Sequence, residues 1–230
     1  MKKISCIVPA YNEGERITNV LEVVSAHSRI DEIIVVNDGS TDNTLEVIKG
    51  FLEKFEKIKL INHEKNKGKS ASLHDALEVT TGEFIFFLDS DLVGLTEQNI
   101  TDLADPIVTD SADVSLSLRR NSPRFWHMIG LDYISGERIL PKKVFAGQMD
   151  NLLSLKPFGF EVFLNRLIIR NNFRIKVVVW PNVDSPYKVV KNGLWKGIKG
   201  DFFMMLDIFR TISIFGPIYQ IIKIKSLMIK

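Results

Sequence analysis

Short apolar runs alternate with amphipathic segments in the first half of the chain. Four segments are typical of strands, at residues 4–9, 32–36, 57–62 and 84–88, and those at 4–9 and 84–88 are apolar enough to be buried. Three intervening segments repeat apolar positions every three to four residues, as on one face of a helix, at residues 14–27, 44–55 and 68–79. Strands that alternate with helices in this way predict right-handed crossovers and a mainly parallel sheet flanked by helices, the α/β class.

The second half of the chain has a less regular pattern. Strands are expected at 113–118 and 175–180 and helices at 161–169, 201–215 and 218–229. Residues 119–150 mix charged, aromatic and glycine residues without a clear period. We therefore expect one α/β domain over residues 1–200 and a C-terminal amphipathic helical appendage over residues 201–230.

The cysteine content and the N-terminal sequence indicate in which compartment the protein is expected. A chain of 230 residues is long enough for one sizeable core, and its single cysteine, Cys6, cannot build a disulfide framework. The N-terminal Met1-Lys2-Lys3 runs directly into the first apolar segment, without the pattern of a signal peptide. The expected location is the cytoplasm.

The net charge is unevenly distributed. Residues 188–230 carry eight Lys/Arg and two Asp, a net charge of +6, which leaves −4 for residues 1–187 out of a total of +2. The longest uncharged run of this tail, residues 211–222, has 12 residues, and a spanning helix needs roughly 18–20. A basic, apolar tail of this kind predicts peripheral contact with the inner face of a membrane. The alternative is that its helices pack on the domain and complete its core.

Polar motifs follow three of the predicted strands. The three motifs are Pro9-Ala10-Tyr11-Asn12-Glu13, Asn37-Asp38-Gly39-Ser40-Thr41-Asp42 and Asp89-Ser90-Asp91. Ligands of open parallel sheets bind beyond the carboxyl ends of the strands. The three motifs therefore predict one binding site at one edge of the sheet.

The residue types in these motifs suit a nucleotide-sugar donor. A carboxylate such as Asp38 accepts a hydrogen bond from a base N–H, and Tyr11 offers a ring on which a base stacks. Asp89 and Asp91 offer the oxygen ligands that Mg²⁺ or Mn²⁺ prefers. Lys69, where the third helix begins, places positive charge near a phosphate group.

Each motif also has an ordinary structural explanation. Two aspartates near a turn are usually solvated or capping, and Asp42 or Thr44 would cap a helix. The histidines His27, His63 and His74 lack ligand-like spacing and are expected to be structural or surface residues. The functional interpretation therefore rests on all three motifs occurring at successive strand ends.

The first half of the chain closely resembles glycosyltransferase family two, which has the GT-A fold. Residues 7–13 are similar to the family's opening strand and donor-binding loop, and residues 35–44 to its nucleoside-binding segment. Residues 66–69 resemble its Asn-x-Gly-Lys motif, and residues 87–91 its metal motif. The resemblance implies Mg²⁺ or Mn²⁺ on Asp89 and Asp91 and inversion by a single displacement. The donor-binding residues that it implies are Pro9, Ala10, Tyr11, Glu13, Asp38, Gly39, Lys69, Asp89 and Ser90.

The second half resembles one branch of that family, which includes dolichyl-phosphate mannose synthase and bacterial polyprenyl-phosphate glycosyltransferases. Residues 132–138, Asp-Tyr-Ile-Ser-Gly-Glu-Arg, are similar to its Asp-x-x-Ser/Thr-Gly-x-Arg motif. Residues 158–162 resemble its Gly-x-x-x-Glu helix start, with a shift of one or two positions. Lys188 lies about where the branch has a basic residue near the donor phosphates. The chain departs from the branch after the metal motif, at residues 92–95, and at residues 184–188, where relatives carry a His or Arg.

Two kinds of acceptor remain open. A hydroxyl acceptor needs a general base, for which Asp132 is the first candidate, acting with Asp91 as the catalytic pair. A polyprenyl phosphate or similar acceptor is already anionic, and Arg119 and Arg138 would then position it. Arg119, Arg138 and Lys188 are also expected to contact the nucleotide-sugar donor.

Other functions remain as alternatives. One is a soluble transferase for a small phosphorylated acceptor, and another is a non-catalytic nucleotide-binding protein. A nucleotidyltransferase would need a glycine-rich basic loop after the first strand, where residues 9–13 stand instead. A nucleic-acid partner is not expected, because the chain has no helix-turn-helix, zinc-finger or RNP-like pattern.

Overall fold

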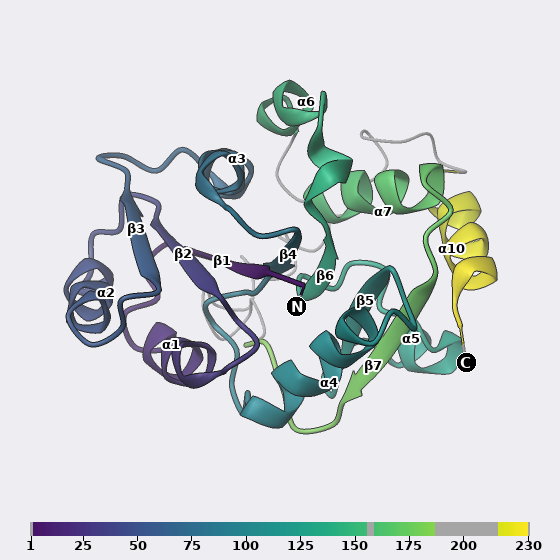
Figure 1. The fold of residues 1–230 in the computed structure, drawn as a ribbon, viewed down its shortest axis with the longest axis horizontal. Helices are drawn as coiled ribbons and strands as arrows, with labels where there is room; N and C mark the ends of the chain where they lie inside the picture. Colours follow the sequence, from purple (N-terminus) through teal and green to yellow (C-terminus); the bar gives the residue numbers. More distant parts are fainter. Residues whose placement is uncertain (1, 156–158, 187–215, 230) are drawn as a thin grey trace, which may run out of the picture.

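A seven-stranded sheet in the order β3-β2-β1-β4-β6-β5-β7 forms the centre of the protein (Figure 1). The computed structural model describes residues 2–155, 159–186 and 216–229. The strands are β1 (Ile4–Ala10), β2 (Glu32–Asn37), β3 (Ile58–Asn62), β4 (Phe84–Phe87), β5 (Val114–Arg119), β6 (Arg138–Pro141) and β7 (Ile175–Trp180). The helices are α1 (Ile17–Ala26), α2 (Thr44–Leu52), α3 (Lys69–Val79), α4 (Glu97–Val108), α5 (Arg124–Ile129), η1 (Lys142–Phe145), α6 (Met149–Leu153), α7 (Phe160–Arg170) and α10 (Gly216–Leu227).

Parallel pairing aligns the carboxyl ends of the first strands. Strand β1 pairs in parallel with β2 and with β4, and β2 pairs in parallel with β3. Strand β6 runs antiparallel to both β4 and β5, and β7 returns parallel to β5. The predicted mostly parallel α/β sheet is confirmed, with β6 as its antiparallel member. This arrangement brings the ends of β1, β2 and β4 to the same edge.

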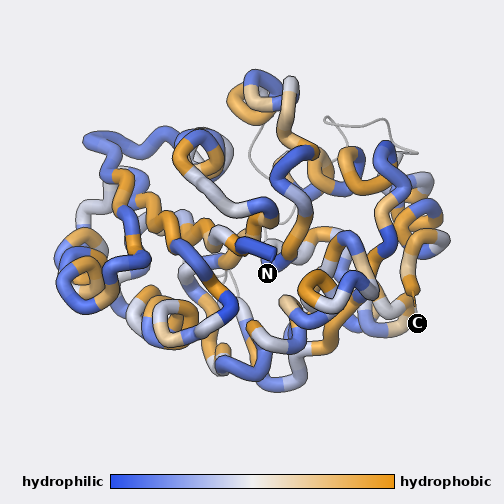
Figure 2. The backbone as a smooth tube through the Cα atoms, viewed as in Figure 1, coloured by the Kyte–Doolittle hydropathy of each residue, from blue (hydrophilic) through white to orange (hydrophobic). Residues whose placement is uncertain are grey.

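Helices cover both faces of the sheet, as Figure 1 shows. The core on one face includes buried side chains of α1, α2 and α4, and the core on the other face includes buried side chains of α3, α6, α7 and α10. All six residues of β2 are buried, which is why its sequence is an apolar run rather than an alternating one. Figure 2 shows the same distribution, with hydrophobic segments along the inner strands.

The predicted strands and helices of residues 4–88 are all present, with shifts of a few residues at their ends. Five described elements have no counterpart in the sequence prediction: α4, α5, β6, η1 and α6. Helix α4 begins with a capping box between Thr96 and Asn99 and contains Pro106 near its end. Strand β6 is four residues long and contains the fully buried Arg138.

The last helix, α10, packs on the domain. Ile224 of α10 is fully buried, and Gln220 accepts a hydrogen bond of 2.7 Å from the Tyr133 hydroxyl. The backbone N–H of Ile229 donates to the carbonyl of Ile175, at the start of β7. One side of α10 therefore packs on the core, while Ile218, Tyr219 and Ile222 of the same helix remain exposed. The predicted helix at 201–215 and the domain boundary at residue 200 lie outside the described residues.

No helix within the described ranges combines the length and the apolar character needed to cross a bilayer.

A buried carboxylate ties three parts of the sheet together and makes a pH-dependent contribution to stability. Glu32 accepts hydrogen bonds from Ser5, from the Thr81 backbone N–H and hydroxyl, and from Lys59. Burial raises the pKa of Glu32, but these hydrogen bonds outweigh it and lower the pKa from 4.5 to about 2. Because the pKa is lower in the folded state, the stabilisation is present above pH 4.5 and is lost as the pH falls toward 2.

We expect Glu32→Gln to lower the free energy of unfolding by about 1–3 kcal/mol at neutral pH, and by progressively less below pH 4.5. Urea unfolding of both proteins at pH 6 and pH 3 measures this. The exposed Glu56 serves as control, since Glu56→Gln should change stability at neither pH. A difference between wild type and Glu32→Gln that is equal at the two pH values would contradict the account.

Candidate active site

A cleft of about 440 Å³ opens at the carboxyl ends of β1, β2 and β4. Nine of the fourteen residues predicted for the site line it: Pro9, Ala10, Tyr11, Glu13, Asp38, Lys69, Asp89, Ser90 and Asp91. The remaining lining residues are Asn66, Gly68, Ser72, Ser185 and Pro186. The structure therefore brings the three predicted motifs together in one place.

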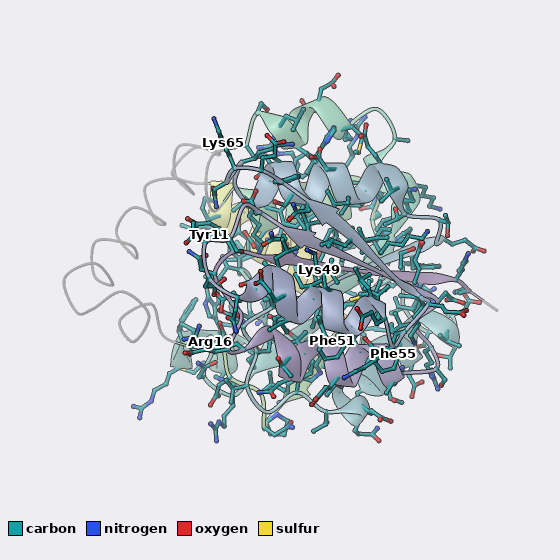
Figure 3. The ribbon with its side chains drawn as sticks, turned by 90° about the vertical axis from the view of Figure 1, so that its left-hand side faces the viewer. Tyr11, Arg16, Lys49, Phe51, Phe55 and Lys65 are labelled. Carbon is teal, nitrogen blue, oxygen red and sulfur yellow. The ribbon has the colours of Figure 1, made fainter. Side chains whose placement is uncertain are left out.

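The loop after β1 is joined to the loop after β2. The side-chain oxygen of Asn12 accepts a hydrogen bond of 2.8 Å from the backbone N–H of Thr41. The backbone N–H of Glu13 donates to the Thr44 hydroxyl at 2.9 Å. Tyr11 is 46% exposed, and Figure 3 shows it on the same side of the molecule as Lys65. The Tyr11 ring is thus accessible at the rim of the cleft.

Asp38 is a buried carboxylate that organises the wall of the cleft. One oxygen, Oδ1, accepts from the backbone N–H of Lys67 at 2.9 Å and lies 2.8 Å from Nδ1 of His63. The other, Oδ2, accepts from the backbone N–H of Gly68 at 2.9 Å. The other ring nitrogen of His63 lies 3.0 Å from Asp75 on α3. Among the described residues Oδ2 has one donor, so its second lone pair remains for a ligand.

Gly39 lets the two loops approach closely. It has a φ of +68°, and a Cβ atom on it would lie 2.4 Å from the backbone carbon of Lys65 and 2.5 Å from the nitrogen of Asn66. Gly39 does not line the cleft, although it was predicted to bind the donor. Its position instead allows the turn after β2 to pack against the loop that donates to Asp38.

The Asp-x-Asp motif lies beside a lysine. Nζ of Lys69 contacts Asp89 at 2.9 Å and Glu161, at the start of α7, at 3.2 Å. Burial lowers the pKa of Lys69, but the two carboxylates outweigh it and raise the pKa above its ordinary value, so Lys69 is a cation here. Asp91 is partly exposed and lines the cleft.

A buried polar cluster adjoins the motif. Arg119 donates to Glu137 at 3.0 Å and lies 3.8 Å from Asp132. Asp132 is 1% exposed and accepts a hydrogen bond of 2.6 Å from Ser122. Burial lowers the pKa of Arg119, but Glu137, Asp89, Asp132 and Asp91 together raise it. Arg119 is thus electrostatically coupled to both aspartates of the motif.

Four of the predicted residues that the structure describes do not line the cleft: Gly39, Arg119, Asp132 and Arg138. Arg138 is fully buried, with its guanidinium donating to the carbonyl of Ser135 and to Asn165 at 3.0 Å. Arg138, which was expected to bind the donor, therefore directs its guanidinium to partners inside the protein and does not line the cleft. Lys188 lies outside the described residues.

The structure adds residues that the sequence analysis did not assign to the site. Glu161 pairs with Lys69, His63 supports Asp38, and Glu137 pairs with Arg119. The position of Glu161 was quoted for its resemblance but was given no role. His63 was expected to be structural, and its sequence position gives no sign that its ring bridges two carboxylates.

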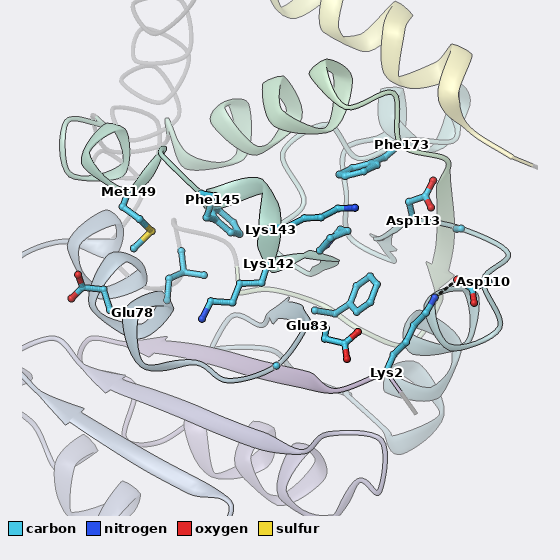
Figure 4. Close-up of a pocket in the computed structure, with 16 residues that line it drawn as sticks. Lys2, Glu78, Glu83, Asp110, Asp113, Lys142, Lys143, Phe145, Met149 and Phe173 are labelled. Carbon is cyan, nitrogen blue, oxygen red and sulfur yellow. Dashed lines mark hydrogen bonds and ion pairs between the residues drawn. The ribbon is translucent and has the colours of Figure 1, made fainter.

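A larger cavity, of about 830 Å³, lies at the opposite edge of the sheet (Figure 4). Its charged groups contact their own neighbours: Lys2 pairs with Asp110, the Lys142 ammonium donates to the Thr80 carbonyl, and Lys143 lies over the Phe173 ring. Its lining has three Lys and four acidic residues, so neither sign of charge dominates. We place the site in the smaller cleft, where the chemically distinctive groups converge.

The charge of the smaller cleft fits a divalent cation. Its lining carries four carboxylates, Glu13, Asp38, Asp89 and Asp91, against the single ammonium of Lys69. A diphosphate would be repelled by this excess of negative charge unless a cation lay between them. Oxygen ligands from Asp89 and Asp91 are those that Mg²⁺ and Mn²⁺ prefer, so the residues present fit the predicted metal.

The fold is similar to that of a structurally known enzyme. Glucosyl-3-phosphoglycerate synthase from Mycobacterium tuberculosis, in complex with Mn²⁺, uridine diphosphate and phosphoglyceric acid, superposes with a TM-score of 0.72. The match has 20% sequence identity and covers 93% of this chain and 79% of that one. At this identity the likeness shows a common fold.

Curated relatives match part of the chain. An uncharacterized glycosyltransferase of Escherichia coli (strain K12) is 37% identical over 90 residues, which are 39% of this chain and 26% of that protein. A dolichyl-phosphate beta-glucosyltransferase of Trichomonas vaginalis is 40% identical over 94 residues, covering 37% of this chain and 28% of that protein. The chain thus spans about a quarter of the length of these relatives.

A family-level match extends further along the chain. Residues 5–171 match the family described as Glycosyl transferase family 2. This range contains all three strand-end motifs and the buried cluster around Arg119. The chain belongs to glycosyl transferase family 2.

Proposed function

We propose that the protein is a metal-dependent inverting glycosyltransferase that moves a sugar from a UDP-sugar to a lipid-linked phosphate at a membrane surface. The observation that carries the proposal is the acidic cleft at the ends of β1, β2 and β4, in which Asp89 and Asp91 lie with Asp38 and Tyr11. The structurally similar synthase has been solved with Mn²⁺ and UDP-glucose, which supports UDP as the nucleotide.

In this proposal the donor lies along the cleft. Tyr11 stacks on the base, and Oδ2 of Asp38 accepts a hydrogen bond from a base N–H. Asp89 and Asp91 would hold Mg²⁺ or Mn²⁺, and Lys69 would add a further positive charge beside them. A divalent cation held there would supply charge neutralisation for the departing UDP.

The burial of Asp132 favours a phosphate acceptor. Asp132 is 1% exposed and already accepts a hydrogen bond from Ser122, so it is poorly placed to take a proton from an incoming hydroxyl. An ionised phosphate oxygen needs no base. It attacks the anomeric carbon from the face opposite the diphosphate, and the bond to UDP breaks with its electron pair leaving on UDP.

An exposed apolar side of α10 supports contact with a membrane. Ile218, Tyr219 and Ile222 are 58%, 57% and 63% exposed, and Lys223 and Lys225 beside them are also exposed. Apolar side chains flanked by lysines are typical of a helix that lies in the headgroup region of an anionic leaflet. Such contact would hold the cleft near a lipid-linked acceptor.

The test is nucleoside diphosphate release from a panel of UDP- and GDP-sugars with Mn²⁺. Separate arms add a polyprenyl phosphate in anionic liposomes, 3-phosphoglycerate, or no acceptor. We expect release from a UDP-sugar that EDTA abolishes and that the polyprenyl phosphate stimulates most. Stimulation by 3-phosphoglycerate alone would indicate a soluble transferase instead. Failure to cleave any donor, or cleavage that survives EDTA, would contradict the proposed chemistry.

A further inference from the structure

The backbone of Gly136 lies directly against the carboxylate of Asp89. A Cβ atom added to Gly136 would lie 2.4 Å from Oδ2, 2.9 Å from Cγ and 3.0 Å from Oδ1 of Asp89, whereas ordinary contacts of a Cβ begin near 3.4 Å. The space that a side chain would occupy at position 136 is therefore filled by a carboxylate of the proposed metal motif.

Strand pairing produces this contact. Strands β4 and β6 are antiparallel, with Phe87 opposite Arg138. Continuing that register by two residues places Asp89, after the end of β4, opposite Gly136, before the start of β6. The contact is thus built into the pairing of the two strands rather than into the conformation of a single loop.

Gly136 lies in a turn that is fixed on both sides. Ser135 and Glu137 are both fully buried. The Glu137 carboxylate accepts from Ser117 at 2.7 Å and from Arg119 at 3.0 Å, and the Ser135 carbonyl accepts from Arg138 at 3.1 Å. Because these bonds hold the turn in place, a side chain at position 136 would displace Asp89 instead of the backbone.

Asp89 is also held from another direction. Nζ of Lys69 contacts Oδ1 of Asp89 at 2.9 Å. Gly136 does not have a positive φ, so its backbone conformation suits any residue. The requirement for glycine at this position therefore comes from the space beside Asp89 and not from backbone strain.

We infer that Gly136 is a positioning residue that sets the orientation of the Asp89 carboxylate toward the divalent cation. The inference rests on the proposed function, because it assumes that Asp89 binds a metal. An alanine at position 136 rotates or pushes the Asp89 carboxylate away while leaving the fold and the nucleoside side of the cleft intact. Gly136 thus links the buried Glu137–Arg119 pair to the geometry of the metal motif.

The test is Mn²⁺ binding, measured by the electron paramagnetic resonance signal of free Mn²⁺, for wild type and Gly136→Ala in the presence of UDP. Groups that orient metal ligands typically change metal affinity 10–100-fold, and we expect a rise in the Mn²⁺ Kd of that size. Calorimetry with UDP in EDTA should give the same UDP Kd within about twofold, because Asp38 and Tyr11 are untouched. The matched control is Gly50→Ala on α2, where an added Cβ meets nothing within 4 Å.

The outcomes separate the inference from the function on which it rests. Equal Mn²⁺ affinity in wild type and Gly136→Ala overturns the inference alone. Lack of Mn²⁺ binding by the wild type overturns it together with the metal-dependent function. If Gly136→Ala does not fold, the double variant Gly136→Ala/Asp89→Ala should fold, because the Asp89 carboxylate that the new methyl group would meet is then absent. A double variant that also fails to fold overturns the inference.

Discussion

Replacing Asp91 with alanine is expected to abolish turnover while the protein stays folded. Asp91 lines the acidic cleft and is partly exposed. Truncating its side chain therefore creates no cavity in the hydrophobic core. Without it the charge on the departing UDP is poorly neutralised, and we expect a loss in kcat of at least about 1,000-fold, equivalent to about 4 kcal/mol of transition-state stabilisation. The melting temperature without donor should stay within about 2 °C of wild type, as for other surface substitutions.

The measurement is UDP release from the active donor with saturating Mn²⁺, together with a thermal unfolding curve. Asp150 on α6 is the matched control, because it is an exposed carboxylate that does not line the cleft. Asp150→Ala should keep full activity. Wild-type turnover in Asp91→Ala, or a loss of turnover that is explained by unfolding, would remove Asp91 from the mechanism.

Replacing Asp38 with alanine is expected to weaken both the fold and donor binding. The carboxylate accepts from the backbone N–H groups of Lys67 and Gly68 and contacts His63, and alanine leaves these donors without a partner. Each partly buried donor left unpaired costs about 1–2 kcal/mol, so we expect the melting temperature to fall by about 5–10 °C. Loss of the hydrogen bond to the base should raise the Kd for UDP at least about tenfold.

A second carboxylate of the same turn separates these two effects. Asp42 accepts from the backbone N–H groups of Thr44 and Gly14 but does not line the cleft. Asp42→Ala should therefore lower the melting temperature without changing the Kd for UDP measured by calorimetry. If Asp38→Ala behaves as Asp42→Ala does, Asp38 is a turn residue and does not recognise the base.

The N-terminal half of the fold could be predicted because its strands, turns and helices are each indicated by a local sequence pattern. Strands β1, β2 and β4 are mainly apolar runs, and β1, β2 and β3 are each followed by a polar turn and a helix. The parallel arrangement follows from that alternation, and the position of the site follows from the parallel arrangement. Nine predicted residues therefore line one cleft although their contacts join segments far apart in the sequence.

The elements that were missed depend on partners elsewhere in the chain. Helix α4 has apolar positions at Ile100, Leu103, Ala104 and Ile107, but Pro106 and a polar first turn obscure the period. Strand β6 is short, ends in proline and contains an arginine, which argues against a buried strand. Its place between β4 and β5 is decided by pairing, and the buried Arg138 is satisfied by Ser135 and Asn165.

The supporting residues of the site could not be predicted for the same reason. The roles of His63, Glu137 and Gly136 arise from side chains that only the folded sheet brings near them. Arg138 shows the converse case, because a residue chosen by motif resemblance proves to be buried inside the protein. Motif spacing located the cleft, but burial decides which of its neighbours face a ligand.

The central claim is that the acidic cleft, and not the larger cavity at the opposite edge of the sheet, is the donor site. Crystals soaked with UDP and Mn²⁺ and measured at the manganese absorption edge test this most directly. We expect the anomalous peak beside Asp91, with the UDP base against Tyr11 and Asp38. Manganese and UDP found in the cavity between Lys2 and Phe173, or UDP absent from the cleft, would contradict the account.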